Sequence, residues 1–247
     1  MPWPWRASSS PPAGHGSPAA DLWDCHVHIL PGIDDGPPDM ETAIGMIRMA
    51  AEHGTAVMVA TPHAIEGLYD TSREQVLAAL ADVRAACEAV GIGVRLLPGQ
   101  EIALVPDLAA RLSSGRLLTY ADQGRAALVE VPSTGLPPYW EQALFDLAVA
   151  GVIPVVAHVE RTPLLTDHKL ADRAAELGAR FQINARVLGT RGSAYRECTR
   201  LIEAGWVACL GSDGHDLAGR KPLMDAALGV PTVQALLRNP PAFMEPE

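Results

Sequence analysis

Residues 22–60 read LWDCHVHILPGIDDGPPDMETAIGMIRMAAEHGTAVMVA and contain a strand, a helix and a second strand. The run 22–29 has the length and apolar content of a strand. Asp39 can cap a helix after the loop, and Gly54 stands where helices commonly end. Residues 56–60 form a second short apolar run. This succession predicts a βαβ unit with parallel strands.

The same alternation continues along the chain. Further strands are predicted at 94–97, 127–131, 154–157, 181–184 and 207–210, and further helices at 71–91, 106–113, 140–150, 168–177 and 194–204. Thr71 and Glu74 form a capping box at the start of the first of these helices. Seven strands, most of them followed by a helix, favour an α/β fold with a parallel sheet, and closure into a barrel buries both sheet edges. A doubly wound open sheet is the alternative.

The chain of 247 residues is long enough for one such domain, which we place at 21–240, and it shows no second domain. Residues 1–20 are rich in Pro, Ser, Ala and Gly and lack the apolar block of a secretory signal, so we expect a disordered N-terminal tail. Residues 241–247 are assigned to a C-terminal tail. No apolar run approaches the ~20 residues that span a bilayer. A cytoplasmic location is therefore expected.

The charge of the chain bears on its partners. The formal net charge is −10 and no basic stripe is present, which argues against a dedicated nucleic-acid binder. An acidic protein can still accept a phosphorylated substrate where bound metal and local cations reverse the field.

Side chains that can bind metals fall at the ends of the predicted strands. His26 and His28 are two residues apart on the first strand, so both project from the same face. The other candidates follow later strands or, for Asp35, lie in the loop after the first: Asp35, His63, Glu101, Glu130, His158, Asp213 and His215. In a barrel all these positions meet at one mouth, where active sites of such folds are built. The histidines outside this pattern are His15, His53 and His168.

Five imidazoles and four carboxylates are too many ligands for one ion, and they suit two or three divalent metals. The mixed nitrogen and oxygen donors favour manganese, iron or zinc over calcium, and the lack of clustered thiolates argues against a structural zinc site. Such ions activate water and neutralise phosphoryl oxygens, which predicts phosphoester hydrolysis. For His63 alone, a hydrogen-bonded structural role is the commoner alternative, and for Glu130 the spacing leaves both roles equally open.

Two arginines are candidate catalytic residues. Arg161 lies three residues past His158 and Arg220 five past His215, so both are expected in loops at the same mouth. A guanidinium there can hold a phosphate by a bidentate fork and stabilise the transition state. The alternative for each is a surface salt bridge.

The cysteines point to structural roles. Cys25, Cys87, Cys198 and Cys209 include no CxxC pair and are expected to be buried thiols. Thiol phosphatases need Cys-x5-Arg, and the residues six places after these cysteines are Pro31, Gly93, Ala204 and His215. A cysteine nucleophile is therefore not expected.

Several motifs together resemble a known family. Residues 24–28, DCHVH, resemble the opening of the polymerase-and-histidinol-phosphatase (PHP) superfamily, and the continuation ILPGIDDG at 29–36 is similar to bacterial protein-tyrosine phosphatases of the CpsB/YwqE type. Further matches are ATPH at 60–63, PGQE at 98–101, VEVP at 129–132, AHVER at 157–161, QIN at 182–184 and SDGH at 212–215. The resemblance covers about 22–220. It departs from the family at Val159, where proline is usual.

The resemblance implies a distorted (β/α)7 barrel of the PHP, TIM-like type with a trinuclear centre that is usually manganese-activated. It implies that the nine residues named above are the metal ligands and that Arg161 and Arg220 contact the phosphate. The implied enzyme is a phosphoric monoester hydrolase, a metal-dependent protein-tyrosine phosphatase that uses metal-activated hydroxide. Its implied substrate is a phosphotyrosine protein, such as a tyrosine kinase of capsule or exopolysaccharide synthesis. The alternatives are a small-molecule phosphatase of the histidinol-phosphate type, another PHP phosphoesterase such as a nuclease, and a non-catalytic binding protein.

Overall fold

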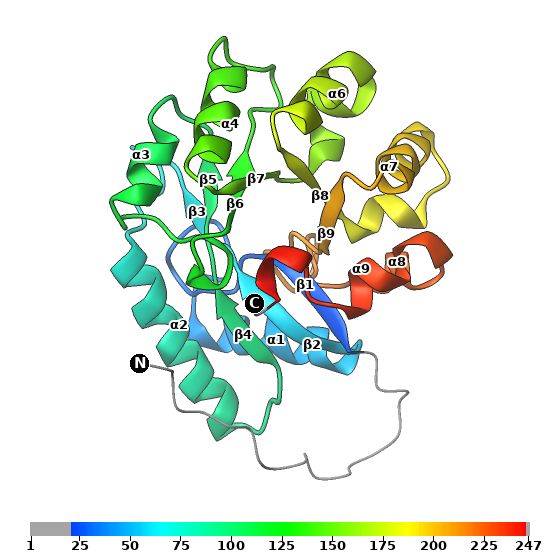
Figure 1. The fold of residues 1–247 in the computed structure, drawn as a ribbon. Helices are drawn as coiled ribbons and strands as arrows, with labels where there is room; N and C mark the ends of the chain where they lie inside the picture. The colour runs from blue at the N-terminus through cyan, green and yellow to red at the C-terminus, as the bar shows by residue number, and fades with distance from the viewer. Residues whose placement is uncertain (1–20, 246–247) are drawn as a thin grey trace.

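The computed structural model describes residues 21–245, which form an α/β fold with strands near the centre and helices around them (Figure 1). The expected N-terminal tail at 1–20, with His15, lies outside the described residues. All strand pairs within the two sheets are parallel, which confirms the predicted class of fold. No helix in the described part of the chain is long and apolar enough to cross a membrane.

The strands form two sheets. The first has the order β1-β2-β4 and contains β1 (Leu22–Val27), β2 (Thr55–Ala60) and β4 (Arg95–Pro98). The second has the order β3-β5-β6-β7-β8-β9 and contains β3 (His63–Ala64), β5 (Glu101–Ala103), β6 (Ala126–Glu130), β7 (Ile153–Val156), β8 (Arg180–Asn184) and β9 (Val207–Gly211). Each of the seven predicted runs therefore contains a strand, and two further strands are present in the described chain.

The two additional strands arise where β2 leads into β3 and β4 into β5. Pro62 lies at the first junction and has no N–H to donate, while its carbonyl accepts from the Glu101 N–H at 3.0 Å. Gly99 lies at the second junction, where a Cβ would stand 3.0 Å from the Val59 side chain. Gly99 thus leaves room for the Val59 side chain of β2. At both junctions the chain passes from the first sheet to the second. The side chains that follow, His63 and Glu101, begin the new strands side by side.

The outer strands β1 and β9 also approach each other. An isolated parallel bridge joins Val27 to Gly214, and the Asp213 N–H donates to the His26 carbonyl at 2.8 Å. The His28 N–H donates to the Gly214 carbonyl at 2.9 Å. These contacts bring the two sheets together without a continuous ladder between β1 and β9 in residues 21–245. Closure into one barrel therefore stays a prediction.

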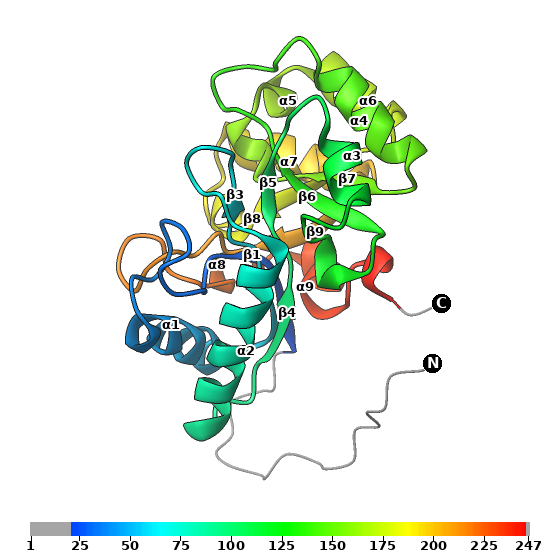
Figure 2. The ribbon, with the colours of Figure 1, turned by 90° about the vertical axis from the view of Figure 1, so that its left-hand side faces the viewer.

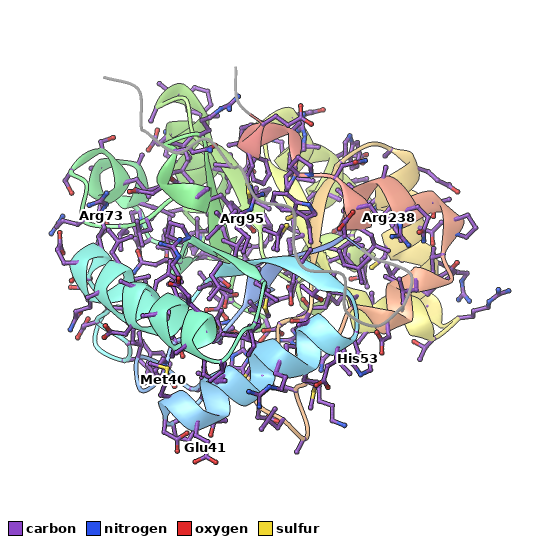
Figure 3. The ribbon with its side chains drawn as sticks, turned by 90° about the horizontal axis from the view of Figure 1, so that it is seen from below. Met40, Glu41, His53, Arg73, Arg95 and Arg238 are labelled. Atoms are coloured by element: carbon purple, nitrogen blue, oxygen red, sulfur yellow. The ribbon has the colours of Figure 1, made fainter. Side chains whose placement is uncertain are left out.

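The helices cover the outside of the sheets. They are α1 (Met40–Glu52), α2 (Arg73–Ala89), α3 (Leu108–Ser113), α4 (Trp140–Val149), α5 (Pro163–Thr166), α6 (His168–Glu176), α7 (Ser193–Glu203), α8 (Asp225–Leu228) and α9 (Gln234–Arg238). Short 3-10 turns are η1 (Tyr120–Asp122), η2 (Val159–Arg161), η3 (Ala185–Gly189), η4 (Pro231–Val233) and η5 (Ala242–Met244). The long helices α1 and α2 lie side by side on one face, with Met40 and His53 marking the two ends of α1 (Figure 3).

The helix caps are partly as predicted. Asp39 caps α1 by accepting from the Thr42 N–H at 2.8 Å, and Gly54 follows with φ of 90°. The predicted capping box of Thr71 and Glu74 is wrong: the box consists of Ser72 and Gln75. The reason is that the Thr71 hydroxyl instead donates to the His63 carbonyl at 2.6 Å, so the helix starts one residue later.

The C-terminal segment packs into the interior. Residues 241–245, which the sequence assigns to a tail, contain η5, and its Phe243 and Met244 are buried. Both belong to an apolar cluster with Cys25, Cys209 and side chains of the central strands. Figure 2 shows the C-terminal turn beside α9. One end of the strands is thus filled with apolar side chains, while the other carries the polar residues described next.

Candidate metal centre

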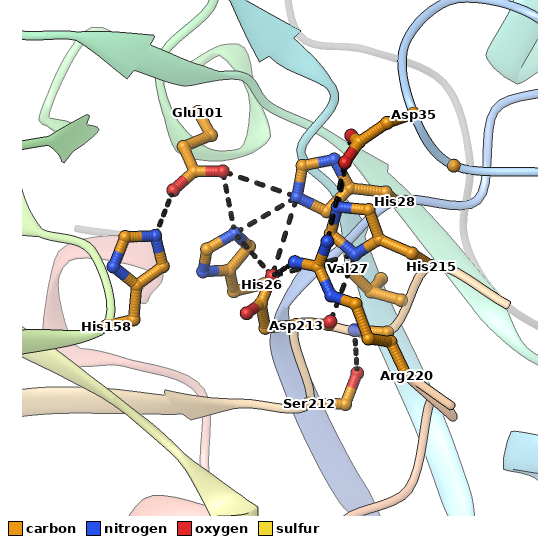
Figure 4. Close-up of polar contacts among 12 residues, drawn as sticks. His26, Val27, His28, Asp35, Glu101, His158, Ser212, Asp213, His215 and Arg220 are labelled. Atoms are coloured by element: carbon orange, nitrogen blue, oxygen red, sulfur yellow. Dashed lines mark hydrogen bonds and ion pairs between the residues drawn. The ribbon is translucent and has the colours of Figure 1, made fainter. Parts of the chain in front are cut away.

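The centre is built around the carboxylate of Glu101, the first residue of β5. Its Oε2 lies 3.1 Å from His26 Nε2, 3.3 Å from His28 Nε2 and 3.2 Å from His63 Nδ1. Its Oε1 lies 2.8 Å from His158 Nε2 (Figure 4). The Nε2 atoms of His26 and His28 are 3.2 Å apart. Four histidines from three parts of the chain therefore face one buried carboxylate.

Two further carboxylates flank this arrangement. Glu130, the last residue of β6, places Oε2 3.6 Å from His63 Nδ1 and Oε1 4.0 Å from His158 Nε2. Asp35 places Oδ1 3.5 Å from His63 Nε2 and 3.2 Å from His215 Nε2. His63 therefore faces three carboxylates, with Nδ1 near Glu101 and Glu130 and Nε2 near Asp35.

Asp213 completes the set of nine predicted ligands. Its Oδ1 lies 3.8 Å from His26 Nε2, 3.9 Å from His28 Nε2 and 3.7 Å from His215 Nδ1. Three groups in the described residues each bring ligand atoms within 4.8 Å of one another: His28, Asp35, His63 and His215; His26, His28 and Glu101; and His63, Glu101 and Glu130. The structure thus brings all nine predicted side chains into one place.

The two arginines also reach the centre, and both bind Asp213. Arg161 Nη2 donates to Asp213 Oδ2, and Arg220 Nη2 donates to Asp213 Oδ1 at 2.8 Å. Arg220 Nη1 also donates to Asp35 Oδ2 at 3.4 Å. Both guanidinium side chains keep about a third of their surface exposed, 31% for Arg161 and 32% for Arg220. They are therefore open to a ligand that enters from solvent.

The electrostatics of the site favour a bound cation. Burial alone opposes protonation of His26, but Glu101 and Asp213 raise its pKa to about 9. Burial likewise opposes protonation of His28, but Asp34 and Glu101 raise its pKa to about 10. Although burial opposes ionisation of Glu101, the surrounding histidines hold its pKa well below the usual value. The carboxylates therefore stabilise positive charge beside the imidazole nitrogens of His26 and His28.

Three histidines are oriented with one nitrogen free for a ligand. His26 Nδ1–H donates to Gln182 Oε1 at 3.0 Å, and His28 Nδ1–H donates to Asp34 Oδ2 at 2.7 Å. His215 Nδ1–H donates to the Asp213 carbonyl at 3.0 Å. Each ring therefore directs Nε2 into the cluster, and such partners fix the tautomer of metal-binding histidines.

The residues present fit a group of divalent ions. Among residues 21–245, seven buried side-chain nitrogen or oxygen atoms lack a hydrogen-bond partner, and five of them belong to this cluster. These are His63 Nδ1, both oxygens of Glu101, His158 Nδ1 and His215 Nε2. Buried polar atoms without partners are rare and call for an explanation such as an ion. Imidazole and carboxylate donors in this number suit manganese, iron or zinc.

The predicted set missed the residues that hold the ligands in place. The Asp34 carboxylate accepts from His28 Nδ1–H and from the His63 N–H at 2.9 Å, and although its burial opposes ionisation, these bonds lower its pKa to about 2. Gln182 Oε1 also accepts from the His158 N–H at 2.6 Å. Gln182 Nε2 donates to Asn184 Oδ1, whose own Nδ2 donates to Asp213 Oδ2, each at 3.0 Å. The QIN motif at 182–184 indicates Gln182 and Asn184. The sequence does not show that Asp34, next to the predicted ligand Asp35, has a supporting role.

Two of the nine residues have strained backbones. His158 has φ of 29° and Asp213 has φ of 54°, in the left-handed region that non-glycine residues rarely adopt. Val159, which stands where the resembled family has proline, is completely buried and begins η2. The turn nevertheless carries Arg161 to Asp213. Valine at this position is therefore compatible with an arginine that reaches the centre.

The two described histidines outside the predicted pattern lie away from the centre. His53 pairs with Asp225 and His168 with Glu197, both at the surface. All four cysteines are free and buried, as predicted. A hydrogen bond with Cys209 and burial raise the pKa of the Cys25 thiol well above its usual value. This thiol is therefore poorly suited to act as a nucleophile.

Comparison with known proteins places the chain. The family description "Capsular polysaccharide synthesis, CpsB/CapC" matches residues 22–234. The chain belongs to this family. It is 32% identical over 242 residues to tyrosine-protein phosphatase YwqE of Bacillus subtilis, covering 90% of this chain and 94% of that protein. It is 26% identical over 215 residues to tyrosine-protein phosphatase CpsB of Streptococcus pneumoniae, covering 84% and 88%.

Solved structures support the same relationship. A structure from the work on YwqE of Bacillus subtilis and CpsB of Streptococcus pneumoniae, metal-dependent tyrosine phosphatases, matches with a TM-score of 0.78 and 32% identity. The match covers 84% of this chain and 85% of that one. An amidohydrolase from Mycoplasma synoviae matches with a TM-score of 0.51 at 10% identity, which shows likeness of fold alone.

Proposed function

We propose that this CpsB/CapC family member is a metal-dependent protein-tyrosine phosphatase, a phosphoric monoester hydrolase. The observation that carries the proposal is the cluster of five histidines and four carboxylates, in which His158 contacts Glu101 and Asp213 lies near His26 and His215, with two part-exposed arginines beside it. Relatives at 26% and 32% identity over most of their length bear the same activity in their names. The domain that we propose for this activity spans 21–240.

We propose that the nine clustered residues hold two or three divalent ions, most suitably manganese. These residues are His26, His28, Asp35, His63, Glu101, Glu130, His158, Asp213 and His215. When bound, such ions supply an activated water and neutralise charge on phosphoryl oxygens. Glu101 is the central ligand because it faces four histidines at once.

The arginines bind and orient the substrate phosphate. Arg161 and Arg220 both donate to Asp213, so their guanidinium groups converge on one edge of the cluster. A phosphate that enters there receives planar donors from two sides, which stabilises the charge that develops during in-line displacement. Exposure of about a third of each side chain lets them meet the ester without leaving the cluster.

The leaving group needs little assistance. The conjugate acid of the tyrosine phenolate has a pKa near 10, so the phenolate can leave from phosphorus without a strong general acid. Burial and the neighbouring His28 lower the pKa of His215 to about 4, so this ring is neutral at pH 7. A neutral imidazole with Nε2 directed at Asp35 is suited to bind an ion rather than to donate a proton.

The finer features of the protein are also proposals. We propose that β1 and β9 close the two sheets into a distorted (β/α)7 barrel of the PHP type, supported by the Val27–Gly214 bridge. We propose a tyrosine kinase of capsule or exopolysaccharide synthesis as the phosphotyrosine protein, on the basis of family membership. A cytoplasmic location follows for a phosphatase that acts on such a kinase.

The test is metal titration with activity. The purified protein is stripped of metal, and Mn²⁺ is added back while hydrolysis of a phosphotyrosine peptide, a phosphoserine peptide and histidinol phosphate is followed. Metal-dependent turnover selective for phosphotyrosine is expected. Turnover of histidinol phosphate alone would replace the protein substrate by a small one, and turnover without metal would overturn the mechanism.

A further inference from the structure

A cavity lies beside the metal centre. Its volume is about 540 Å³, which is within the range of roughly 300–1,000 Å³ typical of ligand sites. It is lined by β3, β5, the loop between β3 and α2, and residues around the end of α3. None of the nine clustered residues lines it, and neither does Arg161 or Arg220.

The cavity and the centre share the same strands. His63 and Ala64 form β3, which pairs with Glu101 and Ile102 of β5. The first residue of each pair belongs to the cluster, and the second lines the cavity. Consecutive strand residues point to opposite faces, so Ala64 and Ile102 face away from the cluster, whereas Ala103 shares the face of Glu101 and also lines the cavity.

An aromatic ring forms the wall between the two. The Tyr69 ring stacks on the His63 ring, with centroids 5.5 Å apart and planes 12° from parallel. Tyr69 also lines the cavity. The loop that carries it is held to the site, because Thr71 donates to the His63 carbonyl at 2.6 Å and Gln100 Nε2 donates to the Thr71 carbonyl at 3.0 Å. The cavity is therefore preformed rather than created by a moving loop.

The floor of the cavity is apolar. Ala64 and Ile102 are buried, and Ile65, Val105 and Leu117 are half-buried along it. Leu68, at the tip of the same loop, leaves 66% of its surface exposed. A cavity lined by apolar side chains is typical of a site that binds a ligand.

The charged residues at the rim nearly balance, since Glu66, Asp70 and Glu74 are acidic and Arg111 and Arg116 are basic. Arg111 Nη1 donates to Glu66 at 2.8 Å and its Nε donates to Asp107 at 2.9 Å. Arg116 Nε donates to the Ser114 hydroxyl at 3.1 Å, and Asp70 accepts from the Gly67 N–H at 2.8 Å. A rim whose charges nearly balance, with Arg111 paired to Glu66, favours an apolar occupant over a highly charged one.

We propose that this cavity takes an apolar side chain of the substrate polypeptide that flanks the phosphotyrosine. The proposal rests on the proposed phosphatase function and names what the enzyme recognises besides the phosphate. A phosphotyrosine whose phosphate reaches the cluster holds its backbone over the mouth, so the next residues along an extended peptide pass Tyr69 and reach the cavity. Substrate selection then comes from burial of that side chain against Ile102, Val105 and Leu117.

The first test compares substrates on the wild-type, manganese-loaded enzyme. Peptides carry one phosphotyrosine with either Leu or Ser at the flanking positions, and para-nitrophenyl phosphate serves as a substrate without a flanking residue. The kcat/KM for the Leu peptides is expected to exceed that for the Ser peptides by about tenfold or more, because a buried leucine side chain is transferred from water. Equal kcat/KM for the two series, with para-nitrophenyl phosphate turned over normally, would overturn the pocket but leave the phosphatase. No turnover of any of these substrates would overturn the proposed function itself.

The second test fills the cavity. Val105→Trp occupies the floor, and Val149→Trp makes the same change at a residue of α4 that is 70% exposed and does not line the cavity. Val105→Trp is expected to abolish the preference for Leu peptides while hydrolysis of para-nitrophenyl phosphate stays within about twofold of wild type. Val149→Trp is expected to change neither. Retention of the Leu preference by a folded Val105→Trp variant would rule out the cavity as the recognition site.

Discussion

Cys25 and His26 are neighbours in β1 and are both completely buried, yet they lie in different surroundings. Cys25 packs in the apolar cluster with Cys209 and Phe243, where a hydrogen bond with Cys209 and burial raise the thiol pKa. His26 faces Glu101, and its Nδ1–H is held by Gln182. Burial is the same for both, so it does not create the site. The difference comes from polar partners that fix one atom of His26 and leave the other directed at a carboxylate.

The largest effect is expected from the carboxylate at the middle of the polar region. Glu101→Gln removes the charge that four histidines face, so the proposed ions bind weakly and activity falls by about a thousandfold or more. Bound manganese per chain, measured by atomic spectroscopy, is expected to fall with it. Glu197→Gln is the matched control, since that glutamate also pairs with a histidine, His168, but at the surface. Full metal content and activity in folded Glu101→Gln would contradict the centre.

A smaller loss is expected from each arginine. Arg161→Ala and Arg220→Ala remove donors that converge beside Asp213, and each is expected to lower kcat/KM by about 10²- to 10³-fold, as for other transition-state donors. Metal content should stay at the wild-type level, because neither residue is a proposed ligand. A variant that loses manganese together with activity would instead assign the arginine a role in holding Asp213.

Asp216 holds the loop that presents Arg220 on the polar side of the molecule. Its Oδ1 accepts from the N–H groups of Ala218 and Gly219, each at 2.6 Å, and from the Arg220 N–H at 3.2 Å. Asp216→Ala is expected to lower kcat/KM by about tenfold through loss of these bonds, and Asp216→Asn to restore most of it, since an amide oxygen also accepts.

A double-mutant cycle identifies the route of this effect. If Asp216 acts by positioning Arg220, then Asp216→Ala costs nothing further in an Arg220→Ala background, because the two changes remove the same interaction. Additive losses in the double variant would show that Asp216 acts elsewhere, for example through His215, whose N–H donates to the Arg220 carbonyl at 2.7 Å.

Much of the fold and of the proposed site is predictable because both follow local rules. Asp39 and Gly54 bound α1 as expected from capping chemistry. The strand pattern alone predicts that His26 and Glu101 lie close together, because parallel strands end at a common edge. The strand pattern does not predict which atoms face each other, since that depends on contacts between residues distant in sequence.

The features that the sequence did not predict also depend on contacts between residues distant in sequence. The capping box moved to Ser72 because Thr71 binds the His63 carbonyl, a tertiary contact that outweighs the local motif. The break between β2 and β3, and that between β4 and β5, reflects close packing at Gly99 and the missing N–H of Pro62. Asp34 was overlooked because its role, to hold His28 and the His63 backbone, exists only once the loop folds over β1.

The smallest effect on activity is expected from Cys25, on the apolar side of β1. Cys25→Ser replaces a buried thiol by a hydroxyl, and because the surroundings are apolar we expect a loss of about 1–3 kcal/mol in the free energy of unfolding. Activity per manganese-loaded, folded molecule should stay within about twofold of wild type, since hydrolysis requires no thiol. Thermal melting measures the first quantity, and kcat normalised to metal content measures the second. A folded, metal-loaded variant without activity would make Cys25 a participant and transfer the chemistry from the polar side of β1 to the apolar one.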